Sequence, residues 1–168
     1  LTTGAGTVWT STSSLGITGT QDGNSYGPTV IVAASNASNT ARAHFVADGT
    51  HDEVEIQAAI DSLPAGGGTV LLTEGTFNVA TTTYDASSIR LATGTRLIGQ
   101  GPSTILELAD GYATGTVSVV GAINIDSVFI SSFKIIGNKT LITESGLYHG
   151  IEINNTGSST IHNVRISD

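Results

Sequence analysis

Residues 50–72 read THDEVEIQAAIDSLPAGGGTVLL, a helical pattern followed directly by an apolar run. Thr50 precedes Glu53 by three positions, which is the spacing of a capping box at a helix N-terminus. Apolar residues then recur at i, i+3, i+4 and i+7, one face of a helix: Ile56, Ala59, Ile60 and Leu63. Pro64 and the glycines at 66–68 end the helical pattern. The stretch therefore predicts a helix at about 51–63 and a strand from about position 69.

Beyond this stretch the chain consists mostly of short apolar runs separated by Gly, Asn, Ser or Asp. The runs are Val70–Leu72, Phe77–Val79, Ile89–Leu91, Arg96–Ile98, Thr104–Leu108, Val117–Val119, Ile123–Ile125, Val128–Ile130, Phe133–Ile135, Ile151–Ile153, Thr160–Ile161 and Val164–Ile166. Runs of this length between turn residues are typical of strands. The gaps have no room for the crossover helices of a doubly wound sheet. The predicted fold class is all-β with one α-helix.

The spacing of these runs predicts a solenoid. Ile123-Asn124-Ile125 recurs as Ile151-Glu152-Ile153 at an offset of 28 (151 − 123). Phe133-Lys134-Ile135 recurs as Val164-Arg165-Ile166 at an offset of 31 (164 − 133). Short strands that recur at such a period are typical of stacked coils, which bury their apolar faces against one another. An antiparallel sandwich also has many short strands, but it needs hairpin turn pairs that are rare here, so a solenoid is favoured.

Six stretches of the chain carry a resemblance to a known family. They are Ala47–Asp61 (ADGTHDEVEIQAAID), Leu63–Val70 (LPAGGGTV), Glu74–Phe77, Leu97–Leu106 (LIGQGPSTIL), Ile135–Asn138 and Gly150–Ile153. Together they resemble the entry of a pectate-lyase-like, right-handed parallel β-helix. The resemblance spans about 41–168 and implies that the helix plugs the first coil, whose strand edges would otherwise be open. Residues 1–40 are expected to form an attachment, assembly or linker segment of irregular strands and loops.

This opening module is widespread in phage tail spikes and tail fibres, and in secreted polysaccharide lyases and hydrolases. The resemblance to spikes implies a homotrimeric virion tail component that presents its coils to a host-surface polysaccharide. Residues 1–40 would then bind other tail proteins. Two alternatives stay open: a secreted polysaccharide lyase or glycoside hydrolase, and a non-catalytic adhesive surface protein. All three imply an extracellular or virion location, and the strand signal directly before Asp168 predicts further coils beyond it.

Composition argues against several other classes of protein. The 168 residues include no cysteine, which excludes a disulfide framework and a thiolate metal site. Six Lys+Arg against 14 Asp+Glu give a formal charge of −8, which argues against a nucleic-acid partner. No apolar run approaches the roughly 20 residues of a membrane-spanning helix. We expect no cofactor, no bound metal and no membrane insertion.

Two pairs of residues become candidate site residues if coils stack at these spacings. An offset of 28 would place Asp126 and Glu152 diagonally on an outer face, roughly 7–9 Å apart. That separation suits the acid and base of inverting glycoside hydrolysis, and the alternative is two solvated carboxylates. An offset of 31 would stack Lys134 under Arg165 as an anion site for an acidic glycan. The alternative there is solvated surface or pairing with a neighbouring subunit.

The complete catalytic motifs of pectate lyases and polygalacturonases are missing from the chain. His149-Gly150 matches only part of one such motif. His149 is therefore expected to be a turn residue between coils, and enzymatic activity stays an open question.

Overall fold

The computed structural model describes residues 27–80, 87–109, 117–137, 148–154 and 165–167. Within these ranges the elements are β1 (Thr29–Ala33), β2 (Phe45–Val46), α1 (Glu53–Asp61), β3 (Gly68–Leu72), β4 (Gly75–Val79), β5 (Ser87–Arg90), β6 (Thr95–Ile98), β7 (Thr104–Leu108), β8 (Val117–Ile123), β9 (Phe129–Ser131), β10 (Lys134–Ile136), β11 (Tyr148–Asn154) and β12 (Arg165–Ser167). The prediction of a mostly β chain with one helix is confirmed for this part of the chain. The run predicted at Thr160–Ile161 lies outside the described residues.

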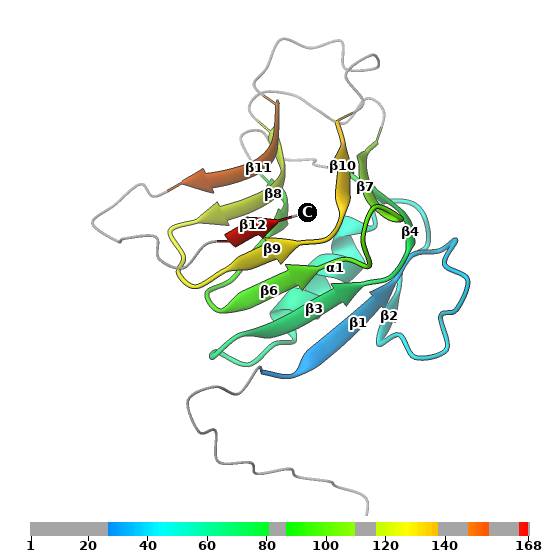
Figure 1. Ribbon diagram of the computed structural model, residues 1–168, viewed down its shortest axis with the longest axis horizontal. Coiled ribbons are helices and arrows are strands. Elements are labelled where there is room, and N and C mark those ends of the chain that lie inside the picture. The colour runs from blue at the N-terminus through cyan, green and yellow to red at the C-terminus, as the bar shows by residue number, and fades with distance from the viewer. Residues whose placement is uncertain (1–26, 81–86, 110–116, 138–147, 155–164, 168) are drawn as a thin grey trace, which may run out of the picture.

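From β3 onward, successive strands lie in three sheets in a repeating order (Figure 1). Sheet A has the order β12-β9-β6-β3-β1-β2, sheet B β10-β7-β4, and sheet C β11-β8-β5. Every strand pair in these sheets is parallel. We refer to β3–β5, β6–β8 and β9–β11 as rounds 1, 2 and 3. Each round contributes one strand to each sheet and pairs with the next round in all three.

The length of one round differs from sheet to sheet. Gly75 pairs with Thr104 in sheet B, an offset of 29 (104 − 75). Arg96 pairs with Phe129 in sheet A, an offset of 33 (129 − 96). The offset varies because the connections at the corners between sheets differ in length. No single period describes the stack.

The predicted offset of 28 is wrong. Residues 123–125 do not form a strand of their own, because β8 continues through Ile123 and ends there. Glu152 consequently pairs with Gly121, at an offset of 31 (152 − 121). The matched triplets resemble each other in sequence, but residues 123–125 cross the end of β8 whereas residues 151–153 lie within β11.

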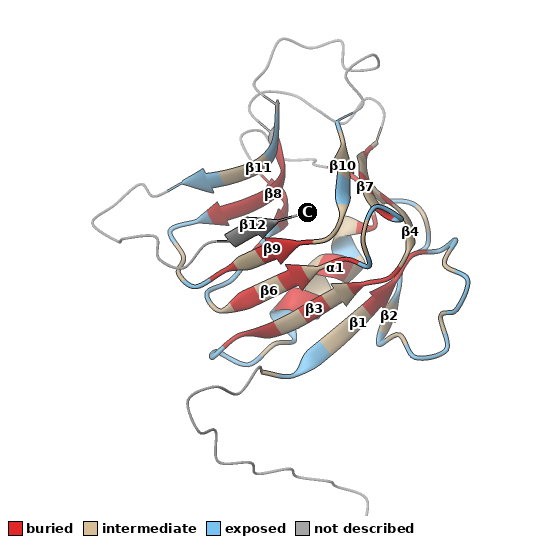
Figure 2. Cartoon of the chain, viewed as in Figure 1, coloured by how far each residue is buried: buried red, intermediate tan, exposed pale blue. Residues whose placement is uncertain are grey.

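Buried and partly exposed residues alternate along β3, β6 and β7 (Figure 2). In β3, Val70 and Leu72 are buried while Thr69 and Leu71 are partly exposed. The largest fully buried side chains come from all three sheets and from α1: Phe77, Ile56, Ile60, Leu72, Ile89, Leu97, Leu106, Leu108 and Ile130. Burial of a side chain of this size contributes about 1.5–3 kcal/mol. Neighbouring rounds therefore stabilise one another through a shared core.

The helix α1 begins two positions later and ends two positions earlier than predicted. Its N-cap is Asp52, which makes no side-chain capping hydrogen bond. The predicted capping box does not form, because the Thr50 amide donates to Asp48 Oδ1 (2.8 Å). Glu53 Oε2 instead accepts a hydrogen bond from the Ala80 amide (2.8 Å). A bond to a segment distant in sequence has replaced the local one.

The buried face of α1 is the predicted one. Ile56, Ala59 and Ile60 are buried, and Leu63 packs against the core from beyond the end of the helix. α1 contacts β3, β4 and β5 of round 1, one strand from each sheet, together with β1 and β2. The helix therefore covers the stack at round 1 (Figure 1).

The strand β1 belongs to sheet A, between β2 and β3. It pairs with β3 from Thr29 with Thr69 to Val32 with Leu72. Val32 and the two residues after it are fully buried. Sheet A therefore includes a strand on the N-terminal side of the predicted boundary at residue 40. Trp9 and the rest of residues 1–26 lie outside the described residues.

Two glycines lie stacked at the corner that leads into sheet A. Gly67 and Gly94 have positive φ angles of 85° and 78°. A Cβ on Gly67 would collide with the carbonyl group of Gly94. In the following round the Asp126 carbonyl accepts a hydrogen bond from the Gly94 amide (3.0 Å). Glycine is needed here because two backbones approach too closely for a side chain between them.

Candidate functional site

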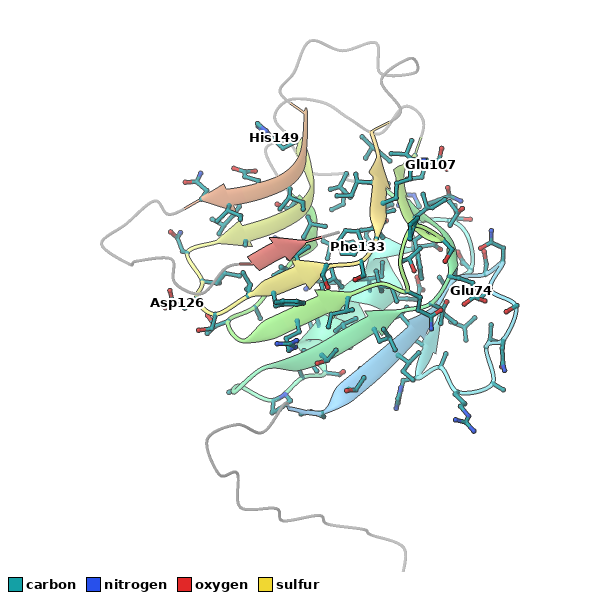
Figure 3. The ribbon with its side chains drawn as sticks, viewed as in Figure 1. Glu74, Glu107, Asp126, Phe133 and His149 are labelled. Carbon is teal, nitrogen blue, oxygen red and sulfur yellow. The ribbon has the colours of Figure 1, made fainter. Side chains whose placement is uncertain are left out.

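Asp126 and Glu152 do not take the predicted diagonal positions. Glu152 lies on β11 opposite Gly121, whereas Asp126 lies in the turn after β8. Asp126 Oδ1 is buried and has no hydrogen-bond partner in the described part of the chain. Figure 3 shows Asp126 on one side of the fold, with Glu74 and Glu107 on the other. These labelled carboxylates do not converge on one point.

Lys134 and Arg165 lie in different sheets, so their predicted stacking is wrong. Lys134 is exposed on β10 and pairs with Ile105 in sheet B. Arg165 lies on β12 and pairs with Phe129 in sheet A. The offset between the paired residues of β9 and β12 is 36 (165 − 129), not the predicted 31, so Arg165 is aligned with Phe129 and not with Lys134.

His149 lies on β11, where it is exposed, and not in a turn as predicted. It pairs in register with Ser118 of β8. Ser118 Oγ donates a hydrogen bond to Ser87 Oγ (2.6 Å), and both serines are buried in sheet C. The two hydroxyls satisfy each other between adjacent strands.

The edge of β4 at round 1 is closed by carboxylates at the start of α1. Asp52 Oδ2 accepts a hydrogen bond from the Asn78 amide (2.8 Å), and the Asp52 amide donates to the Asn78 carbonyl (2.9 Å). Asp52 Oδ1 accepts from the Gly49 amide (2.7 Å). Asp52 is fully buried, and burial raises the pKa of its carboxyl despite these hydrogen bonds.

Glu53 also binds a backbone amide after β4, and its side chain lies beside His51. Glu53 Oε2 accepts from the Ala80 amide, and Glu53 Oε1 lies 3.0 Å from His51 Nδ1. Burial, with repulsion from the neighbouring acids, raises the pKa of Glu55. The described residues contain no group of three or more His, Asp or Glu that could hold a metal ion. The carboxylates of Asp52 and Glu53 bind backbone amides.

The backbone of β1 hydrogen-bonds to both the amide and the side chain of His44. The His44 amide donates to the Ile31 carbonyl (2.8 Å), and the Ile31 amide donates to His44 Nδ1 (2.9 Å). Because Nδ1 accepts here, the neutral ring carries its proton on Nε2. A side chain thus takes the place of a peptide group beside β1.

The outward face of sheet A brings together two residues that the sequence patterns did not single out. The Arg96 guanidinium carbon lies 4.4 Å from the centroid of the Phe129 ring. The two residues face each other in register on β6 and β9. Each stands within a predicted strand, but their proximity depends on an offset of 33, which the repeats did not reveal.

Comparison with protein-family models, curated proteins and solved structures finds no match to this chain. Among the described residues, no helix is long and apolar enough to cross a membrane. The site must therefore be interpreted from its own geometry.

Proposed function

We propose that rounds 1, 2 and 3 are coils of a right-handed parallel β-helix and that the three sheets are its faces. Three observations support this proposal: the repeating order of the sheets, the parallel pairing throughout, and the helix over round 1. Crossover connections between parallel strands are right-handed in almost all proteins, which supports the handedness. The recurrence of one strand per sheet in every round carries the proposal.

We further propose that this β-helix belongs to a virion tail spike or tail fibre that recognises a host-surface glycan. The resemblance of residues 47–70 to the opening module of such proteins supports this assignment. The closed edges at round 1 also support it, since a rigid stack must not pair edge to edge with other chains. Outward side chains on the sheets would then contact the glycan.

A polysaccharide lyase or hydrolase is the weaker candidate. Its predicted acid and base, Asp126 and Glu152, depended on an offset that is wrong. An adhesive surface protein would also bind a glycan, but it would not be part of a virion tail. We therefore favour recognition over catalysis.

Light scattering on the 168-residue chain and retention on immobilised cell-surface polysaccharide test this function together. We expect three times the chain mass and retention without release of oligosaccharide. A monomer that no polysaccharide retains would contradict the proposal. Release of oligosaccharide would assign the chain to the enzymatic alternative.

A further inference from the structure

Three consecutive strands of sheet A place basic and aromatic residues in one column. Arg96 on β6 pairs with Phe129 on β9, and Phe129 pairs with Arg165 on β12. Neighbouring strands lie about 4.8 Å apart, so the backbones of the two arginines are roughly 10 Å apart with Phe129 between them. Residues separated by many positions in sequence thus meet at one register position.

Arg96 and Phe129 lie on the outward face of the sheet. Leu97 and Ile130, the next residues along β6 and β9, pair with each other and are buried in the core. Because alternate residues of a strand point to opposite faces, Arg96 and Phe129 point away from that core. Both are partly exposed, so they contact solvent from the surface of the sheet.

The contact between Arg96 and Phe129 determines which chemical groups this position can bind. At 4.4 Å from the ring centroid, the guanidinium is held over the aromatic face by a cation–π contact. A guanidinium binds a carboxylate through two parallel N–H groups in its own plane. An aromatic ring offers an apolar surface to the C–H face of a sugar.

The charge of the chain narrows the class of ligand. The net charge is −8, and two of the six Lys and Arg residues stand in this column. The negative charge of the rest of the chain repels polyanions in general, so an anionic ligand must be held by local contacts in this column. A sugar that carries a carboxylate beside an apolar C–H face matches the Arg96 guanidinium and the Phe129 ring.

We propose that Arg96 and Phe129 bind a carboxylate-bearing sugar of an acidic glycan. This inference rests on the proposed glycan-recognition function and names its ligand class. The Arg96 guanidinium takes the carboxylate, and the Phe129 ring supports the sugar beside it. The anion site therefore lies on sheet A and does not include Lys134 of sheet B.

Calorimetric titration of the 168-residue chain tests the inference with four probes: oligogalacturonate, oligosialic acid, methyl-esterified oligogalacturonate, and a short single-stranded DNA of matched charge. We expect at least one acidic oligosaccharide to bind, and the ester and the DNA to bind at least tenfold more weakly. The two acidic probes distinguish a uronate ligand from a sialate ligand. An ester or a DNA that binds as tightly as the acidic sugar would overturn the inference.

Three variants locate the site, with circular dichroism to establish that each is folded. Arg96→Gln removes the guanidinium and should weaken binding roughly tenfold, as expected for a lost charged hydrogen bond. Phe129→Leu should weaken it without changing the charge. Lys134→Gln removes one positive charge from an exposed position on another sheet and should leave binding unchanged.

Equal losses in Arg96→Gln and Lys134→Gln would show only general attraction of anions and would overturn the site. A trimer that is retained on cell-surface polysaccharide but binds neither acidic probe would overturn this inference alone. A monomer retained by no polysaccharide would contradict the proposed function itself.

Discussion

The side chain of Gln57 pairs with the backbone of Arg90 as a neighbouring strand would. The Arg90 amide donates to Gln57 Oε1 (2.9 Å), and Gln57 Nε2 donates to the Arg90 carbonyl (3.1 Å). A primary amide carries the same donor and acceptor as a peptide group. One helical side chain therefore closes the edge of β5, the first strand of sheet C.

Replacing Gln57 with Leu should open this edge. We expect a loss of about 1–2 kcal/mol in the free energy of unfolding, because two partly exposed hydrogen bonds disappear. The free edge should also promote association between chains. Urea unfolding measures the first effect and light scattering the second. Asp61→Asn, at the exposed end of the same helix, keeps the oxygen that Gln57 binds and should change neither.

Gly67 and Gly66 are adjacent, but only at Gly67 would a Cβ collide with neighbouring atoms. Gly67→Ala should destabilise the chain by about 2 kcal/mol or more, because a positive φ and a collision with the Gly94 backbone coincide. Gly66→Ala should change stability by less than about 0.5 kcal/mol, since a Cβ there meets no atom within 4 Å. Equal unfolding midpoints for the two variants would contradict the close stacking of this corner.

The sequence predicted which residues face inward better than it predicted which residues meet. Alternation in Val70–Leu72 and Phe77–Val79 correctly located strands and their buried side chains. Such alternation is a local property, because it follows from the geometry of a single strand.

Register is not local, since it depends on the length of the chain in each corner. The resemblance between the triplets 123–125 and 151–153 carried no information about those corners. Arg96 and Phe129 formed no pattern in the sequence until an offset of 33 placed them together. The capping box failed for the same reason, because Glu53 found a distant partner in Ala80.

The buried carboxyl of Asp52 should make stability depend on pH in an unusual direction. Burial raises its pKa above the ordinary value of 3.8, so the folded chain binds this proton more tightly than the unfolded chain does. This group's contribution to stability is therefore greatest below about 3.8 and is lost as the pH rises through the raised pKa.

Asp52→Asn tests this direction. An asparagine has one oxygen in place of the two that accept hydrogen bonds from the Gly49 and Asn78 amides. We therefore expect the free energy of unfolding to fall by about 1–3 kcal/mol near neutral pH. The wild-type advantage should grow as the pH falls from neutral toward 4, because only the wild type gains from protonation at this position. Urea unfolding at several pH values measures it, and a shrinking advantage would contradict the assigned shift.

Glu74 should show the opposite dependence on pH. Its Oε1 accepts hydrogen bonds from the Ser38 hydroxyl (2.6 Å) and the Ser38 amide (2.9 Å). These bonds hold the pKa of Glu74 below its ordinary value of 4.5. Its stabilising contribution is therefore present above pH 4.5 and is lost as the pH falls through the lowered pKa.

Glu74→Gln should accordingly be less stable than the wild type at neutral pH and approach it in acid. Because Glu74 is partly exposed, added salt should weaken the charge-dependent part of the difference. Ser38→Ala removes the hydroxyl that binds the carboxylate and should reproduce part of the same pH dependence. A difference between wild type and Glu74→Gln that stays constant from pH 7 to pH 3 would show that the Ser38 bonds do not favour the charged carboxylate.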